Sequence, residues 1–253
     1  MLNIIKYKFL SLIVFVSLLF INAEANASEF NILVTNDDSI HTPEIKHLVH
    51  NLQNIANVYV VAPNTNKSGT GRFLTPTWNE LNIKPIYKHT RLLGHAIIDG
   101  YPADTVRIAV KKLYKDIKFD LIVSGINQGL NYGRYRYYSG TIGAAIESLS
   151  LGIPAIAISQ YHNGGIKTTK LAAKITNQVV RYIKKNKLPE GILLNINIPS
   201  EIYKGIIFSP RKTLFKTELN ALKEGYITIS SLNINLDDIW LDNYFKHLSI
   251  ASQ

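Results

Sequence analysis

The sequence predicts an α/β protein with a mainly parallel β-sheet and helices on both of its faces. Short apolar runs rich in Ile and Val alternate with amphipathic segments from Phe30 to about Pro199, and this alternation is typical of βαβ units. Three of the apolar runs end in unusually polar loops. The length of 253 residues suits one domain, or one domain with a small appendage.

Strands are expected where a few apolar residues stand together and a polar turn follows. The first, Asn31–Thr35, runs directly into two adjacent aspartates. The other expected strands cover residues 58–62, 120–124, 154–159 and 192–196, with two short strands or a hairpin in 81–98. After Pro199 the pattern loosens, and strands at 206–209 and 226–230 would belong to a small C-terminal β appendage that begins at about residue 200.

Helices are expected between these strands. Thr42 and Pro43 are typical of a helix start, as N-cap and first helical residue. The apolar residues that follow have helical spacing, at positions 45, 48, 49 and 52. Further helices are expected over residues 102–114, 140–151 and 168–185, and the apolar residues of the first of these should face inward at 103, 106, 110 and 113.

The N-terminus has the pattern of a secretory signal peptide. Lys6 and Lys8 precede an apolar run over residues 9–21, and the small residues Ala25-Asn26-Ala27 follow. The run is shorter than the roughly 20 residues of a membrane-spanning helix, so we expect cleavage after Ala27 and no permanent membrane anchor. Residues 1–27 would be removed on export to the periplasm, and residues 28–253 would form a single domain.

Composition excludes some chemistry and leaves several partners open. The chain has no cysteine, so disulfides, zinc–thiolate sites and a cysteine nucleophile are excluded. The net charge of +10 suits nucleic acid, an anionic membrane surface or a phosphorylated substrate. The lysines are spread along the chain and no aromatic–basic motif accompanies them. We therefore expect solvated basic faces and no stable nucleic-acid complex.

Polar loops follow three of the expected strands, over residues 36–39, 64–71 and 124–133. The carboxyl ends of parallel strands share one edge of a sheet, where ligands bind, so these loops should meet. Adjacent carboxylates with hydroxyl and amide oxygens suit a hard divalent ion. Ser139-Gly140-Thr141 opens an expected helix, whose N-terminus favours an anion such as phosphate. An Asn-Asp-Asp-Ser run is, however, equally typical of a turn with a helix cap.

Four segments resemble, in order and spacing, the signature segments of the SurE family of survival-protein nucleotidases and acid phosphatases. They read ILVTNDDSIHTPEI, VVAPNTNKSGTGRFLT, IIDGYPADTVRIAV and DLIVSGINQGLNYGRYRYYSGTIGAAIESLSLGIPAIAIS. The resemblance resumes at LLNINIP, and GYITISSLNINL is similar to the closing strand of the family. It implies a three-layer Rossmann-like fold and the divalent-metal-dependent hydrolysis of nucleoside 5′- and 3′-monophosphates, with one Mg²⁺ or Mn²⁺ ion in each subunit.

The resemblance also assigns roles to residues. The acidic pair of the family falls on Asp37 and Asp38, which would be both catalytic and metal-binding. Ser68 and Asn127 would complete the metal ligands. The residues expected to line the phosphate and substrate pocket are Asn36, Ser139, Gly140 and Thr141.

The chain departs from the family pattern at three places. Ser39 stands where the family usually has glycine after the acidic pair. Arg134-Tyr135-Arg136-Tyr137 replaces a segment that is often acidic, and we hypothesise that it favours anionic substrates or replaces an acidic contact. Only a short bridge joins Arg211 to Gly225, where the family usually carries a longer extension that exchanges contacts between subunits. A homodimer is the assembly that the resemblance allows.

Two other functions stay open at this stage. One is a phosphatase of the haloacid-dehalogenase type with an aspartyl nucleophile, although the Asp-x-Asp spacing of that superfamily is missing. The other is a non-catalytic periplasmic module that binds a nucleotide or a metal. Hydrolysis of a phosphate ester that a chelator abolishes would separate the enzyme from the binding module.

Overall fold

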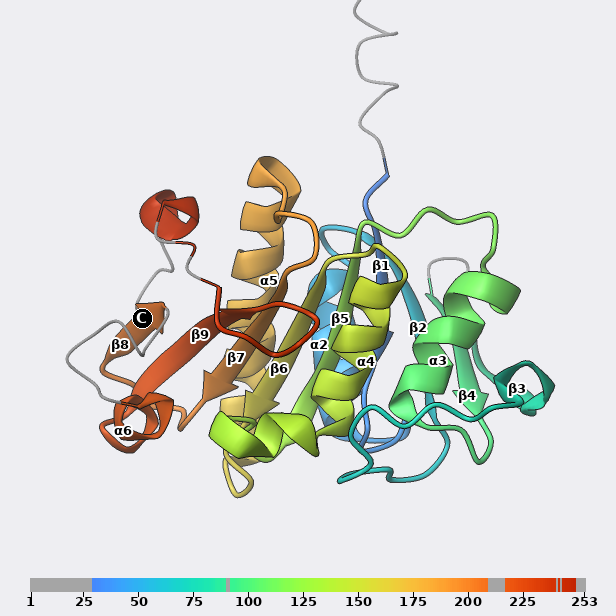
Figure 1. Cartoon of the computed structure of the whole chain (residues 1–253), viewed down its shortest axis with the longest axis horizontal. Helices are drawn as coiled ribbons and strands as arrows, with labels where there is room; N and C mark the ends of the chain where they lie inside the picture. Colours follow the sequence, from blue (N-terminus) through green and yellow to red (C-terminus); the bar gives the residue numbers. More distant parts are fainter. Residues whose placement is uncertain (1–28, 90–91, 209–216, 240, 242, 249–253) are drawn as a thin grey trace, which may run out of the picture.

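One nine-stranded sheet forms the centre of the described chain, with strand order β3-β4-β2-β1-β5-β6-β7-β9-β8 (Figure 1). The computed structural model describes residues 29–89, 92–208, 217–239, 241 and 243–248. The central strands β4, β2, β1, β5, β6 and β7 are parallel to one another, whereas β3 and β9 run antiparallel to their neighbours β4 and β7. The predicted fold class, a mainly parallel α/β sheet, is confirmed.

The strands lie close to their predicted positions because each central one is a run of apolar residues with almost no exposed surface. Their bounds are β1 Asn31–Thr35, β2 Asn57–Pro63, β3 Ile83–His89, β4 Leu92–Ile97, β5 Leu121–Gln128, β6 Ala155–Gln160, β7 Leu193–Ile198, β8 Gly205–Phe208 and β9 Tyr226–Leu232. The hairpin expected in 81–98 is the antiparallel pair β3–β4.

Helices cover both faces of the sheet, which gives three layers (Figure 1). On one face α2 (Pro43–Leu52) packs against α5 (Gly165–Asn186), and their apolar stripes meet the core residues of β1, β5 and β6. On the other face α3 (Pro102–Ile108) packs beside α4 (Gly140–Ser150). The helix expected over 102–114 continues beyond α3 as a π-helical turn, η2 (Ala109–Leu113).

The C-terminal strands extend the central sheet. We expected β8 and β9 in a small β appendage, but β9 pairs with β7 and β8 pairs with β9 at one edge of the sheet. The short helix α6 (Glu218–Lys223), which the sequence pattern did not predict, precedes β9. A strand that pairs with β7 buries its apolar residues in the main core, so the C-terminal segment belongs to the same structural unit.

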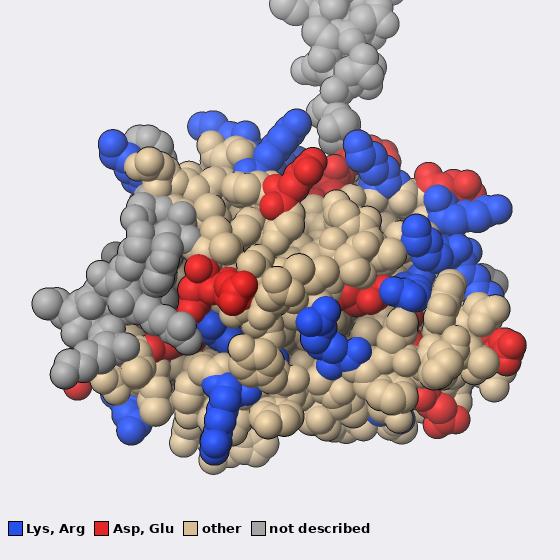
Figure 2. Space-filling view, in the orientation of Figure 1, with Lys and Arg blue, Asp and Glu red and all other residues tan. Residues whose placement is uncertain are grey.

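The structure bears only in part on two expectations, namely a signal peptide without a permanent membrane anchor and solvated basic faces. The predicted signal peptide, residues 1–27, lies outside the described residues. Among the described helices, none is long and apolar enough to cross a membrane. Figure 2 shows one face of the molecule, on which Lys and Arg side chains are separated by uncharged surface and by Asp and Glu side chains. This face therefore does not present one continuous basic patch.

Candidate active site

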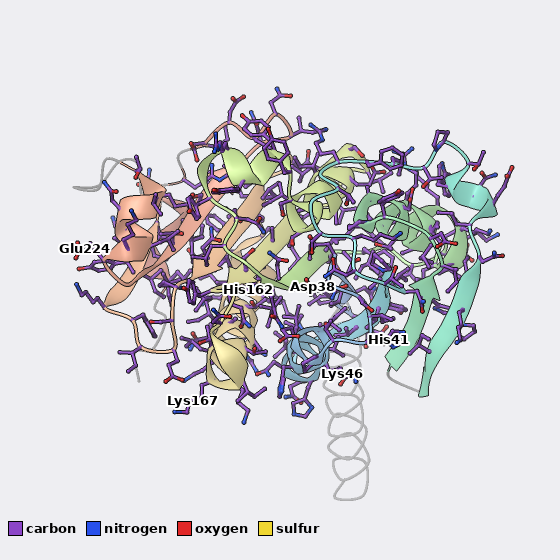
Figure 3. The ribbon with its side chains drawn as sticks, turned by 90° about the horizontal axis from the view of Figure 1, so that it is seen from below. Asp38, His41, Lys46, His162, Lys167 and Glu224 are labelled. Atoms are coloured by element: carbon purple, nitrogen blue, oxygen red, sulfur yellow. The ribbon has the colours of Figure 1, made fainter. Side chains whose placement is uncertain are left out.

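The predicted polar loops meet at the carboxyl edge of the parallel strands. Figure 3 looks onto this edge, where Asp38 lies between His41 on one side and His162 on the other. Three contacts hold the loops together. The backbone N–H of Lys67 donates to Asp37 O (2.7 Å), that of Gln128 donates to the Asp38 carboxylate (3.0 Å), and that of Gly71 donates to Tyr138 O (2.9 Å). Chain segments as far apart as Asp38 and Gln128, which are 90 positions apart in the sequence, thus lie together.

Asp37 is the buried member of the acidic pair, with 2% of its surface exposed. Its Oδ1 accepts a hydrogen bond of 2.7 Å from Thr141 Oγ1, in the first turn of α4. Gly140 allows this approach, because a Cβ atom added there would lie 2.8 Å from Asp37 Cβ. The end of β1 and the N-terminus of α4 are thus in direct contact. The metal-binding role of Asp37 and the phosphate-binding roles of Gly140 and Thr141 stay predictions.

Asp38 faces the other two loops and is partly exposed. Its Oδ1 lies 3.3 Å from Asn66 Nδ2 and 3.5 Å from Ser68 Oγ, and its Oδ2 accepts from the backbone N–H of Gln128 (3.0 Å). The side chain of Gln128 continues the network to Glu44 on α2, at 2.7 Å. Ser68 is therefore beside the acidic pair, as predicted.

The acidic pair is under electrostatic strain. Burial raises the pKa of Asp37 to about 6, and the neighbouring charge of Asp38 adds to the rise, whereas the hydroxyl and backbone N–H of Thr141 oppose it. Burial also raises the pKa of Asp38, opposed by the Gln128 N–H and reinforced by the charge of Glu44. A cation between the two carboxylates would relieve both effects.

Asn36 and Ser39 shape the turn that presents the acids. Asn36 is fully buried, and its side-chain amide donates to Ser39 O (2.8 Å) and Thr42 Oγ1 (3.3 Å). Both hydrogens of the amide are thereby used inside the turn, and a contact of Asn36 with phosphate stays a prediction. Ser39 adopts a φ of 112°, and its hydroxyl donates to Asn64 O (2.9 Å). The position where the family usually has glycine therefore combines a strained backbone with a cross-loop hydrogen bond.

Ser139 begins α4. Its Oγ accepts from Ile142 N (3.1 Å), which is the standard N-cap contact. The N-terminus of this 11-residue helix favours negative charge, and Asp37 lies against it. The serine hydroxyl thus supports the helix end, and the backbone N–H of Thr141 interacts with Asp37.

Asn127 is buried at the end of β5. Its Nδ2 donates to Gly129 O (2.6 Å), so the amide oxygen is the atom that it can offer to a cation. Sequence reasoning did not single out Asn66 and Gln128, which bind Asp38 directly. Both stood in the polar loops that predicted the site, but Gln128 contacts Asp38 through its backbone N–H, which residue type does not reveal.

One hypothesis needs correction. Arg136 is 3% exposed, and its guanidinium forms ion pairs with Glu218 and with Asp238 (3.1 Å). It also donates to Ser230 Oγ (3.1 Å). A guanidinium that is buried and paired in this way is not available to an anionic substrate, so Arg136 acts as a structural link between the loop before α4 and the C-terminal segment. Arg134 is exposed and lies 6.0 Å from the centroid of the Tyr135 ring.

The donor set fits a hard divalent cation. Two carboxylates, a serine hydroxyl and an amide oxygen are the ligand types that Mg²⁺ and Mn²⁺ prefer. In the described part of the chain, no group of three or more His, Cys, Asp or Glu side chains is arranged to hold a metal. A cation at this site would therefore depend on neutral oxygens beside Asp37 and Asp38.

Comparison with known proteins points in the same direction. Residues 32–216 match the family model of the survival protein SurE. A 5′-nucleotidase SurE of Petrotoga mobilis is 34% identical over 239 residues, which cover 81% of this chain and 93% of the relative. One from Legionella pneumophila is 42% identical over 168 residues, which cover 66% of this chain and 64% of the relative. The crystal structure of the SurE protein from Aquifex aeolicus superposes with a TM-score of 0.70 at 28% identity, over 85% of this chain and 96% of that one.

Proposed function

Because the chain belongs to the SurE family, we propose that it is a divalent-cation-dependent phosphomonoesterase. Its substrates would be nucleoside 5′-monophosphates, together with 3′-monophosphates, and its products a nucleoside and phosphate. The relatives named 5′-nucleotidase support the substrate class. The observation that carries the proposal is the contact between Asp37 and the N-terminus of α4. A cation held by the acidic pair would then lie beside an anion held by the helix end.

The residues of the chain divide the work as follows. The N-terminus of α4 binds the phosphoryl group, because the positive end of the helix dipole favours an anion. Thr141 fixes the Asp37 carboxylate through its hydroxyl. The Gln128 N–H and Asn66 orient Asp38. Charge that develops on the phosphoryl oxygens during in-line attack by water is stabilised by the same helix N-terminus.

The residues that would hold the cation are Asp37, Asp38, Ser68 and Asn127, and a bound Mg²⁺ or Mn²⁺ supplies charge neutralisation at phosphate and raises the acidity of water. Glu44 reinforces the negative field, since its charge lies near enough to Asp38 to raise its pKa. Gly140 leaves room between the acid and the helix for this approach. Asn36 and Ser39 keep the acidic turn in one conformation.

We also propose that residues 1–27 are removed as a signal peptide and that the protein works in the periplasm as one domain, residues 28–253. The basic start, the apolar run and Ala25-Asn26-Ala27 support this. N-terminal mass analysis of the protein recovered from a periplasmic fraction tests it, and a mature chain that begins at Ser28 is expected.

The decisive experiment compares hydrolysis of adenosine 5′-monophosphate with Mg²⁺, with Mn²⁺ and with a chelator. We expect phosphate release with a divalent cation and none in chelator. Asp38→Asn should lower kcat by about 10²-fold or more, because this is the usual effect of removing one charged or polar group from a preorganised site. Asp116→Asn is the matched control, because Asp116 is exposed and precedes β5, whereas the acidic pair follows the end of the parallel strand β1; it should keep full activity.

Two results would count against the proposal. Turnover that persists in chelator would rule out cation dependence, and an Asp38→Asn variant with the activity of the wild type would mean that the site is elsewhere. Circular dichroism of each variant verifies that the fold is retained.

A further inference from the structure

We propose that Phe73 and Tyr101 form an aromatic subsite that stacks on the base of the bound nucleotide. The inference rests on the proposed function, and it adds the part of the substrate that the phosphate and cation sites do not contact. The two rings form an edge-to-face pair, with centroids 4.5 Å apart and an interplanar angle of 60°. Phe73 is 51% exposed, so one side of this pair is open to a ligand.

Both rings come from segments that build the active site. Phe73 follows Gly71, whose N–H donates to Tyr138 O directly before Ser139 (2.9 Å). Tyr101 precedes Pro102, whose Cγ would lie 3.0 Å from a Cβ atom at Gly140. Each ring is therefore anchored, within two residues, to the segment that opens α4 and binds the phosphoryl group.

Lys67 links the aromatic pair to the acidic pair. Its backbone N–H donates to Asp37 O (2.7 Å), and its ammonium lies 5.0 Å from the centroid of the Tyr101 ring. A cation on one face of an aromatic ring, beside an anion site, offers charge to a phosphate and a flat surface to a base. This combination suits a nucleotide better than a phosphate ester that lacks an aromatic base.

Stacking recognises the flat face of a base and not its edge. The subsite should therefore favour nucleotides over phosphate esters that lack a base, with little choice among the four bases. Adenosine 5′-monophosphate and ribose 5-phosphate are the matched pair of substrates, since they differ only in the base.

The test measures kcat and KM of wild type, Phe73→Ala and Tyr101→Leu for both compounds. The backbone N–H of Tyr101, which donates to Asp104 Oδ2 (2.9 Å) at the start of α3, remains in Tyr101→Leu. For adenosine 5′-monophosphate we expect each variant to lower kcat/KM by about 5- to 100-fold, mainly through KM. For ribose 5-phosphate we expect a change below about 2-fold. Phe73→Trp should retain the preference for the nucleotide.

Tyr135→Ala is the control, because Tyr135 is as exposed as Phe73 (49%) but packs against Tyr132. It should not change the ratio between the two substrates. Equal losses on both substrates, or no loss on the nucleotide, would overturn the inference. If the wild type hydrolyses neither compound, the proposed function fails, and calorimetric binding of the same two compounds to wild type and Phe73→Ala then decides on the subsite by itself.

Discussion

Replacing Arg136 by Met should destabilise the protein more than any exposed charge substitution. Arg136 and Glu218 are 3% and 4% exposed, and Asp238 is the second acidic partner. Glu218 Oε1 also accepts from Thr228 Oγ1 (2.8 Å) and Asn197 Nδ2 (3.1 Å). Removal of the guanidinium leaves a buried carboxylate without its cation, which costs about 3–5 kcal/mol. That is a large fraction of the free energy of unfolding of a typical domain, which is about 5–15 kcal/mol.

Urea unfolding followed by circular dichroism measures this change in the free energy of unfolding. Lys204→Met is the control, since Lys204 pairs with Glu224 at 3.3 Å and both side chains are 60% exposed, and we expect a loss of about 1 kcal/mol or less. Arg136→Met combined with Glu218→Gln should recover much of the loss, because no charge is then left buried alone. The reasoning would be refuted if Arg136→Met cost no more than Lys204→Met.

Two further predictions concern the site itself. In the cation-free protein the pKa of Asp37 is raised from 3.8 to about 6, so the folded state binds more protons than the unfolded state in this interval and stability falls as the pH rises through it. The free energy of unfolding of Asp37→Asn should therefore exceed that of wild type at pH 7.5 by about 3 kcal/mol. Urea titrations in the presence of a chelator measure this difference, which should shrink toward pH 4. A difference that does not depend on pH would contradict the prediction. Gly143→Ala would place a Cβ atom 1.9 Å from Gly71 O, so we expect the free energy of unfolding to fall by about 1–3 kcal/mol and kcat/KM to fall as well. Gly205→Ala is the control, because the added Cβ atom meets only ordinary contacts there, and it should behave as wild type in both assays.

The sequence was sufficient to predict the parallel core and the meeting of the polar loops at one edge of the sheet. Runs such as Asn31–Thr35 are apolar because both faces of a central strand are buried, so their position can be read without knowing their neighbours. The loops after them share one edge once the strands are parallel. Asp37, Asp38, Ser68 and Thr141 therefore converge as expected.

The parts that the sequence did not reveal depend on contacts between distant residues. The ion pairs of Arg136 reach partners 82 and 102 positions away, and an arginine among tyrosines gave no sign of burial. The helix α6 has six residues, too few for a helical pattern. That β9 pairs with β7 follows from the core that it covers, which periodicity within β9 cannot show. The Gln128 N–H is a backbone donor, and residue type carries no signal for it.

Ser39 shows how this chain compensates a departure from its family. A φ of 112° is strained for any residue with a Cβ atom, at a cost on the order of 1–3 kcal/mol. The hydroxyl that glycine would lack donates to Asn64 O at 2.9 Å, which contributes about 0.5–1.5 kcal/mol. Asn36 holds the carbonyl of the same residue, and Ile40 N donates to Pro63 O (3.0 Å). The hydroxyl alone does not offset the strain, so the surrounding bonds must hold the turn, and they tie the loop of the acidic pair to the start of the loop that carries Ser68. Ser39 therefore accepts local backbone strain and helps to hold the loop of the acidic pair in a fixed position relative to the loop that carries Ser68.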